Sequence, residues 1–224
     1  MRGDFPHQLS YNRFVERQAQ VALHLLLFLQ PCALGKCSGI SIIDSTPLAS
    51  CHIKRERQHR TMRGWAAKGK CTMGFYGFKL HLVINDKGEI IQWKLTPGNV
   101  DDREPLKDKR FTQRLFEKLF ADRGYISQNL FEMLFADNIH LVTKIKKNMK
   151  NSLMSLYDKI LLRKRSVIET MNDELKNVCQ IEHTRHCSFD NFATNLIAGL
   201  IAYNLLPKKP EMNIEIIDKS RIIA

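Results

Sequence analysis

Three carboxylates stand in three different settings along the chain and could together hold divalent metal ions. Asp44 and Asp122 each follow a short, mostly apolar run, and Glu169 lies in a pattern of helical spacing that begins at Arg163. Two carboxylates at the ends of buried strands and one on a facing helix can bind a pair of cations. Such a pair activates a water or a DNA 3′ hydroxyl for attack on a phosphodiester.

Each acid taken alone also has an ordinary structural interpretation. An aspartate after a strand is commonly a turn-forming residue. Arg165 and Glu169 are spaced as an i,i+4 ion pair on the surface of a helix. The three acids together, in alternating strand and helix order and beside clustered basic residues, favour a catalytic site.

The charge of the chain points to an acidic partner. The 224 residues carry a formal net charge of +12, and 44% are hydrophobic, which is enough for one sizeable domain with additional segments. Nucleic acid is the first expectation and an anionic membrane surface the second. Basic residues concentrate in 54–70 and 144–165, and each cluster flanks one of the proposed acids in the sequence. We therefore expect phosphate contacts there, although lysine and arginine also cover ordinary surfaces.

The cysteines and apolar runs favour a cytoplasmic protein with no membrane partner. None of the six cysteines forms a CxxC pair, so the usual zinc spacing is absent and we expect reduced thiols. The apolar run 21–29 is too short to span a bilayer, and asparagines interrupt the run 193–206. Both runs are predicted to be buried helices.

The order of predicted elements indicates an α/β fold. We expect a helix over 11–29 that Pro31 ends, a linker over 32–39, and a short buried strand over 40–43 with Asp44 at its exit. Residues 52–70 have no period and predict a long loop. Further elements are strands at 76–84, 89–95, 118–121 and 139–145, and helices at 106–116 and 128–136, the last capped by Ser127. Three antiparallel strands followed by βαβ units predict a mixed sheet flanked by helices.

The predicted helix over 163–178 has an apolar and a polar face. Its apolar stripe has steps of three and four residues and consists of Ile168, Met171, Leu175 and Val178. Arg165, Glu169 and Lys176 share the polar face. This arrangement suits a metal ligand that also lies against phosphates.

Five segments of the chain carry a resemblance to a known family: residues 43–48, 77–81, 95–102, 121–125 and the helix with Glu169, Asn172 and Lys176. With these segments in this order, the sequence resembles DDE transposases of bacterial insertion sequences, most closely the insertion-sequence family numbered 982. The resemblance covers about residues 5–210. It implies a ribonuclease-H-like catalytic domain that cleaves DNA and transfers strands during transposition.

The resemblance also implies roles for individual residues. Asp44, Asp122 and Glu169 would bind two Mg²⁺ ions, for which Mn²⁺ can substitute. Arg165 and Lys176 would hold phosphates near the scissile bond, whereas Leu162 stands where related transposases carry a tyrosine. The partners would be the ends of the insertion sequence and the target DNA, bound by a homo-oligomer in the bacterial cytoplasm.

Further DNA contacts are expected from the basic clusters. These candidates are Lys54, Arg55, Arg57, Trp65 and Lys164. Trp65 lies within the first cluster and could stack on a base.

The predicted organisation has three parts. Residues 1–36 would be a helical N-terminal remnant and linker, 37–207 the catalytic domain, and 208–224 a C-terminal tail. Because related proteins usually carry a further N-terminal helical region, we expect an N-terminally truncated chain. An alternative function is therefore a truncated, inactive relative that still binds DNA, and another is a metal-dependent nuclease without strand transfer.

Overall fold

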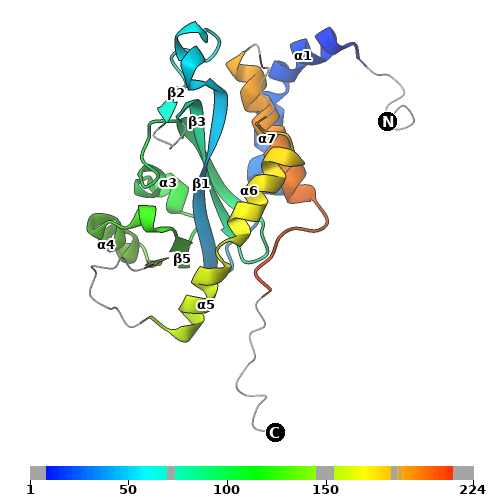
Figure 1. The fold of residues 1–224 in the computed structure, drawn as a ribbon. Coiled ribbons are helices and arrows are strands. Elements are labelled where there is room, and N and C mark those ends of the chain that lie inside the picture. The colour runs from blue at the N-terminus through cyan, green and yellow to red at the C-terminus, as the bar shows by residue number, and fades with distance from the viewer. Residues whose placement is uncertain (1–8, 70–73, 145–153, 183–185, 187, 214–224) are drawn as a thin grey trace.

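The computed structural model describes residues 9–69, 74–144, 154–182, 186 and 188–213. A six-stranded mixed sheet forms its centre (Figure 1). The strands are β1 (Ile40–His52), β2 (Ala67–Gly69), β3 (Phe75–Asn85), β4 (Ile90–Pro97), β5 (Glu117–Ala121) and β6 (Ile139–Thr143). β3 pairs antiparallel with β1, β2 and β4, whereas β1 pairs parallel with β5 and β5 with β6. The predicted mixed sheet is thus confirmed.

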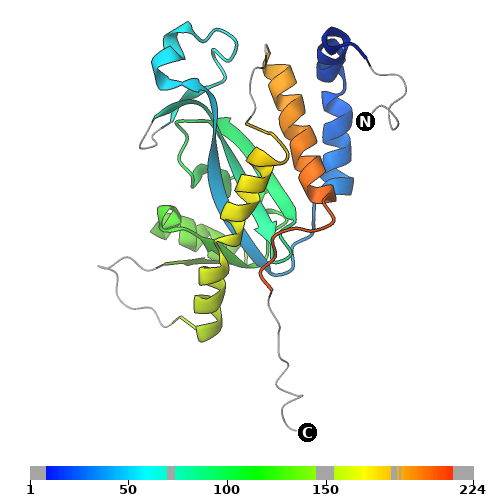
Figure 2. The ribbon, with the colours of Figure 1, turned by 45° about the vertical axis from the view of Figure 1, so that its right-hand side comes forward.

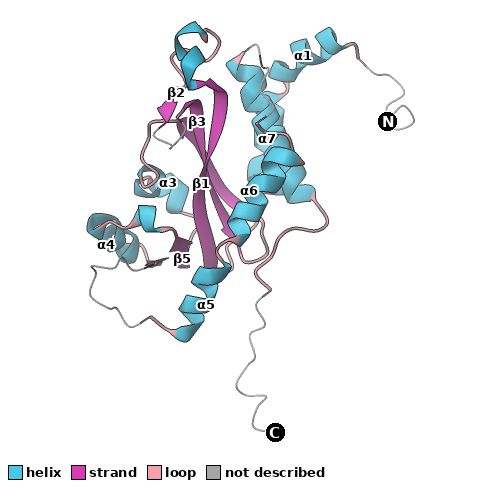
Figure 3. Cartoon of the chain, viewed as in Figure 1, coloured by secondary structure: helices cyan, strands magenta, loops and turns pink. Residues whose placement is uncertain are grey.

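Two apolar cores lie on the two faces of this sheet, because side chains alternate along each strand. One core joins Ile42 and Leu80 to α6 (Val167–Asn177) and α7 (Phe189–Leu205). The other joins Ile43 and Val83 to the segments between β4 and β6. Those segments are η3 (Glu104–Lys107), α3 (Lys109–Thr112), η4 (Arg123–Tyr125) and α4 (Gln128–Ala136). Figure 3 shows the strands as a layer between these helices.

β1 is much longer than the predicted strand over 40–43, so Asp44 does not lie at its exit. The strand continues for 13 residues and pairs with β3 as far as His52. β5 pairs only with residues 40–42 of β1, so the second half of the strand has one edge that β5 does not cover. Pro47 is tolerated there because a strand edge needs no N–H donor.

The N-terminal helix is also divided differently from the prediction. It consists of α1 (Tyr11–Gln20), α2 (Ala22–Phe28) and the π-helical turn η1 (Leu29–Ala33). Pro31 does not end it, because the Leu34 N–H bonds to the Leu29 carbonyl at 3.0 Å and bypasses the proline. α1 and α2 lie beside α7, as Figure 2 shows.

Three further predictions needed correction. Within the predicted loop 52–70 the chain forms the 3₁₀ helix η2 (Ile53–Gln58) and β2. The predicted helix 106–116 is reduced to η3 and α3, with Pro105 at the second position of η3. The helix 163–178 is divided at Arg165 and Ser166 into α5 (Leu156–Lys164) and α6. Val178, placed in the apolar stripe, is exposed.

Other predictions are confirmed. β3, β4, β5, α4 and the buried helix α7 lie where they were expected, to within a few residues. Ser127 is the N-cap residue of α4, although its side chain makes no capping hydrogen bond. Ile145, the last residue of one predicted strand, lies outside the described residues, as do Cys71 and Cys187. The four described cysteines are free, and no helix in the described part of the chain is long and apolar enough to cross a membrane.

Candidate active site

The sheet register brings two of the three predicted acids side by side. Ile42 of β1 pairs with Phe120 of β5 in the parallel ladder. Asp44 lies two residues after Ile42, in the middle of β1. Asp122 lies two residues after Phe120, directly after β5. Glu169 lies in the first turn of α6, which packs against β1.

The charge state of Asp44 shows that the three acids share one electrostatic environment. Burial raises the pKa of Asp44 to about 6, and the negative charges of Glu169 and Asp122 raise it further. A hydrogen bond from the Ser45 backbone N–H and the positive charge of Arg165 oppose this rise in pKa. Burial, together with two neighbouring carboxylates, thus disfavours ionisation of Asp44.

Arg165 is the cation that compensates these acids. Its Nη2 lies 3.3 Å from Glu169 Oε1 and 3.8 Å from Asp122 Oδ1, and its side chain is only 11% exposed. The residue occupies the junction between α5 and α6. The arginine predicted to hold a phosphate is therefore directed at the acids in this structure.

Two polar residues of α6 fix the helix on β1. Asn172 Nδ2 donates to Asp44 Oδ2 at 3.3 Å. Lys176 Nζ donates to the Pro47 carbonyl at 2.9 Å and lies 3.1 Å from Glu182 Oε2. Lys176 is thus in contact with the protein on two sides, and Asn172 is a site residue whose role the sequence did not reveal.

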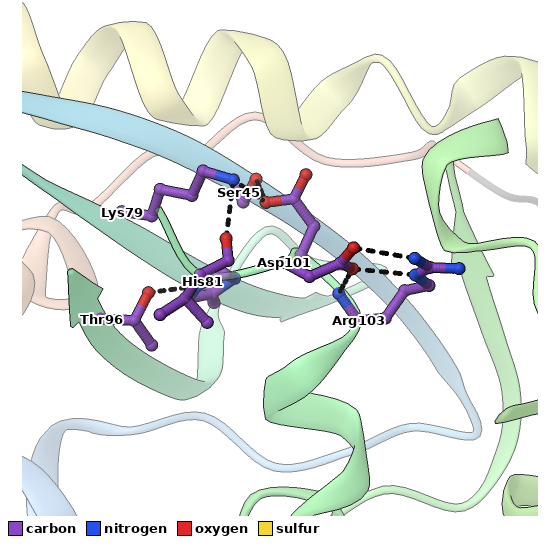
Figure 4. Close-up of polar contacts among 8 residues, drawn as sticks. Ser45, Lys79, His81, Thr96, Asp101 and Arg103 are labelled. Atoms are coloured by element: carbon purple, nitrogen blue, oxygen red, sulfur yellow. Dashed lines mark hydrogen bonds and ion pairs between the residues drawn. The ribbon is translucent and has the colours of Figure 1, made fainter. Parts of the chain in front are cut away.

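A second polar group is formed around Ser45, the residue that follows Asp44 in β1 (Figure 4). Asp102 Oδ1 accepts hydrogen bonds from Ser45 Oγ at 2.8 Å and from Lys79 Nζ at 2.9 Å. The same Lys79 Nζ donates to the Val100 carbonyl at 2.9 Å. Because Ser45 directly follows Asp44, these bonds hold β1 in place at the site. The segments that contain Ser45, Lys79 and Asp102 carry the family resemblance, but the sequence did not predict that these three residues contact one another.

Tyr125 links the two polar groups. Its side chain is buried. Burial raises the pKa of Tyr125 well above its usual range, and the charges of Asp44 and Asp102 raise it further.

The remaining predicted DNA contacts lie elsewhere. Lys54, Arg55 and Arg57 belong to η2, beyond the far end of β1. His52 is eight residues from Asp44, or about 26 Å along an extended strand. Lys54, Arg55 and Arg57 therefore follow the end of β1 that is distant from Asp44.

Two other candidates make contacts within the protein. Trp65 is 57% exposed, and one face of its indole stacks on Phe189 with ring centroids 4.4 Å apart. Lys164 Nζ donates to the carbonyls of Met212 and Asn213 at 2.6 and 2.7 Å. Within the second basic cluster, residues 145–153 lie outside the described residues.

The donor atoms at the site suit a hard divalent cation, since carboxylate and amide oxygens are its preferred ligands. Asn172 Oδ1, on the side chain that contacts Asp44, is buried and has no hydrogen-bond partner among the described residues. However, no three His, Cys, Asp or Glu side chains within 9–69, 74–144 and the other described ranges are arranged closely enough to hold a metal ion. The chemistry of the donors therefore fits, while Arg165 supplies the positive charge.

Comparison with known proteins decides the family. Residues 34–189 match the family model described as a transposase DDE domain, which covers more than half of the chain. The chain belongs to the transposase DDE domain family. No curated protein sequence matches it.

Solved structures similar to this DDE domain are themselves transposases. The piggyBac transposase in a synaptic complex with hairpin DNA is 14% identical with a TM-score of 0.38, over 65% of this chain and 33% of that chain. The Mos1 strand transfer complex is 14% identical with a TM-score of 0.33, over 88% and 61%. The Mos1 catalytic domain is 13% identical with a TM-score of 0.24, over 88% and 93%. The chain thus spans about a third of the piggyBac protein and three fifths of the Mos1 chain in its complex.

Proposed function

We propose that this protein is the transposase of a bacterial insertion sequence, which cuts DNA at the ends of the element and joins them to target DNA. Asp44, Asp122 and Glu169 are its catalytic carboxylates. One observation carries the proposal: Arg165 lies within ion-pair distance of both Asp122 and Glu169, and Asn172 on the same helix as Glu169 donates to Asp44. Acids gathered in this way around a buried carboxylate are typical of a functional site.

The three carboxylates would hold two Mg²⁺ ions, or Mn²⁺ in their place. When bound, the cations would supply an activated water or 3′ hydroxyl and stabilise the leaving oxygen. The rest of the chemistry belongs to the chain itself. Asn172 orients the Asp44 carboxylate, and Ser45 fixes it from the backbone.

The DNA would be held by residues around this centre. Arg165 is the candidate for the phosphate next to the scissile bond, because a guanidinium binds phosphate oxygens in a planar fork. Lys54, Arg55 and Arg57 would contact the backbone of the duplex farther along, and Trp65 would offer its open face to a base. Lys176 and Lys164, which already bind backbone carbonyls, would act mainly by fixing α6 and the segment 207–213. A homo-oligomer that brings two DNA ends together completes the proposal.

The test uses linear duplexes that carry the DNA flanking the gene on both sides, incubated with the protein and Mg²⁺. We expect cut strands and products joined to a second, labelled duplex. Asp44→Asn should abolish both products, whereas Glu132→Gln should leave them unchanged, because Glu132 is an exposed acid on α4 that contacts Gln128. Full activity of Asp44→Asn would refute the assignment, and cut strands without joined products would indicate a nuclease.

A non-catalytic DNA-binding protein is the second candidate. It is favoured by the observation that no three described acids are close enough to hold a metal ion. In that case the protein would bind the same duplexes in a salt-dependent way, and neither Mg²⁺ nor Mn²⁺ would produce cleavage.

A further inference from the structure

The candidate active site contains its own cation. Arg165 forms the described ion pairs of both Asp122 and Glu169, and its charge also acts on Asp44. Its side chain is 11% exposed, whereas those of Asp122 and Glu169 are 52% and 61% exposed. The guanidinium therefore lies inside the group of acids, where its positive charge takes the place that a bound cation would have.

These ion pairs are weak enough to be exchanged. The distance from Arg165 to Asp122 is 3.8 Å, which is too long for a hydrogen bond. The distance to Glu169 is 3.3 Å, at the long end of the hydrogen-bond range. Both acids are more than half exposed, so water screens each pair and reduces its strength. A divalent cation, with twice the charge and a preference for carboxylate oxygens, can compete for them.

The position of Arg165 in the chain also allows its side chain to turn away. It follows the last residue of α5 and precedes α6, and the Ile168 N–H bonds to its carbonyl oxygen at 3.1 Å. The backbone is thus fixed by its own hydrogen bond. The long side chain can change rotamer without disturbing either helix, since among the described residues the polar partners of the guanidinium are Asp122 and Glu169.

We infer that Arg165 is an internal competitor of the divalent cation: it neutralises Asp122 and Glu169 in the cation-free protein and must leave them when the cation binds. This inference rests on the proposed function and adds a role to the phosphate contact suggested above. Two consequences follow. In the cation-free site, Arg165 reduces the charge repulsion between the carboxylates. It also makes the affinity for a divalent cation lower than the three carboxylates alone would give.

The test measures Mn²⁺ affinity by the electron paramagnetic resonance signal of free Mn²⁺, without DNA. Arg165→Gln should bind Mn²⁺ about three- to tenfold more tightly than the wild type, the range expected for removing a screened ion pair with two carboxylates. Arg163→Gln is the matched control, because it removes the same charge from an exposed position two residues away. Its affinity should change by less than about twofold, since screening weakens distant charges. Circular dichroism verifies that each variant is folded.

A second variant separates charge from packing. Arg165→Lys keeps the positive charge and should bind Mn²⁺ with close to the wild-type affinity. If Arg165 acted through packing alone, the affinity of Arg165→Lys would instead match that of Arg165→Gln. Equal affinities for wild type and Arg165→Gln would overturn the competition while leaving the proposed function intact. Weaker binding by Arg165→Gln would also overturn it. Absence of Mn²⁺ binding in every protein, including the wild type, would instead refute the metal-dependent function itself.

Discussion

Two groups of acids flank β1, and they differ in how their charge is compensated. In the group formed by η3, α3 and the segment before them, each acid has its own base: Asp101 with Arg103, Asp102 with Lys79, and Asp108 with Lys94, at 2.7–2.9 Å. In the other group, Asp44, Asp122 and Glu169 share the single guanidinium of Arg165.

The pKa values follow this difference. Hydrogen bonds from Arg103 lower the pKa of Asp101, and a hydrogen bond from Lys94 lowers that of Asp108. Burial raises the pKa of Asp44 instead. An acid paired with its own base stabilises the fold, whereas a group that lacks positive charge is where an external cation is expected.

The largest contrast is expected in activity. Glu169→Gln should lower the rate of DNA cleavage by about a hundredfold or more, because it removes a charge from the reacting centre. Glu104→Gln changes a comparably exposed glutamate of the other group, paired with Lys107 at 2.5 Å. Its cleavage rate should stay within about twofold of the wild type, since a surface pair contributes little. Equal losses in both variants, measured under single-turnover conditions, would remove the distinction between the groups.

The next effect is on stability. The folded protein holds the Asp44 proton more tightly than the unfolded chain does, because the pKa rises from 3.8 to about 6. The loss of folding stability that results from ionising Asp44 is absent below pH 3.8, grows as the pH rises towards 6 and is complete above pH 6. Each pH unit of that interval corresponds to about 1.4 kcal/mol. The ionised Asp44 carboxylate therefore lowers the free energy of unfolding by about 3 kcal/mol.

Asp44→Asn should therefore increase the free energy of unfolding at pH 8 by up to that amount and leave it unchanged below pH 3.8. Urea denaturation at the two pH values checks this. The matched variant Asp102→Asn should lower the free energy of unfolding at pH 8, since Asp102 is paired with Lys79. A loss of stability in Asp44→Asn at pH 8 would contradict the destabilising effect of the buried, ionised carboxylate.

A smaller effect is expected for Lys79→Met. The Lys79 side chain is 18% exposed and donates to both Asp102 and the Val100 carbonyl. Its loss should lower the free energy of unfolding by about 2 kcal/mol, the range for a hydrogen bond to a charged group. Lys94→Met, whose side chain is 37% exposed, should cost less. Thermal melting of the two variants gives the comparison, and the reverse order would show that burial does not set the strength of these pairs.

The smallest effect is expected for Asp101→Asn. The pKa of Asp101 lies below its usual range, so its stabilisation is present at neutral pH and is lost in acid. Its side chain is 46% exposed, so the loss at neutral pH should be below about 1 kcal/mol and should shrink in high salt. A loss that does not depend on salt would indicate a packing role instead.

The elements with a clear sequence pattern could be predicted. The alternation over 76–84 identifies β3, and its two faces enter the two cores, with Leu80 and Leu82 in one and Val83 in the other. Asp122 lies at the end of β5, as its position after the run 118–121 indicates. The length of β1 could not be predicted, because Ser45-Thr46-Pro47 has the composition of a turn. Only the absence of β5 along that edge makes a proline acceptable there.

The contacts of the site were less predictable than its acids. The polar face of the helix over 163–178 predicts that Arg165 and Glu169 lie together, but not that the helix breaks at Arg165 and directs its guanidinium to Asp122. Similarly, Lys164 has the appearance of a surface lysine, yet it binds carbonyls of the segment at Met212. Contacts between residues so distant in sequence depend on packing, which a local pattern does not record.

Anomalous diffraction from a crystal of the protein soaked in Mn²⁺ would locate the cation directly. We expect a peak within about 2.2 Å of carboxylate oxygens of Asp44 and of at least one of Asp122 and Glu169, with Arg165 turned away from them. A peak at Asp101 or Asp102 instead, or none near Asp44 at saturating Mn²⁺, would contradict the proposed cation site.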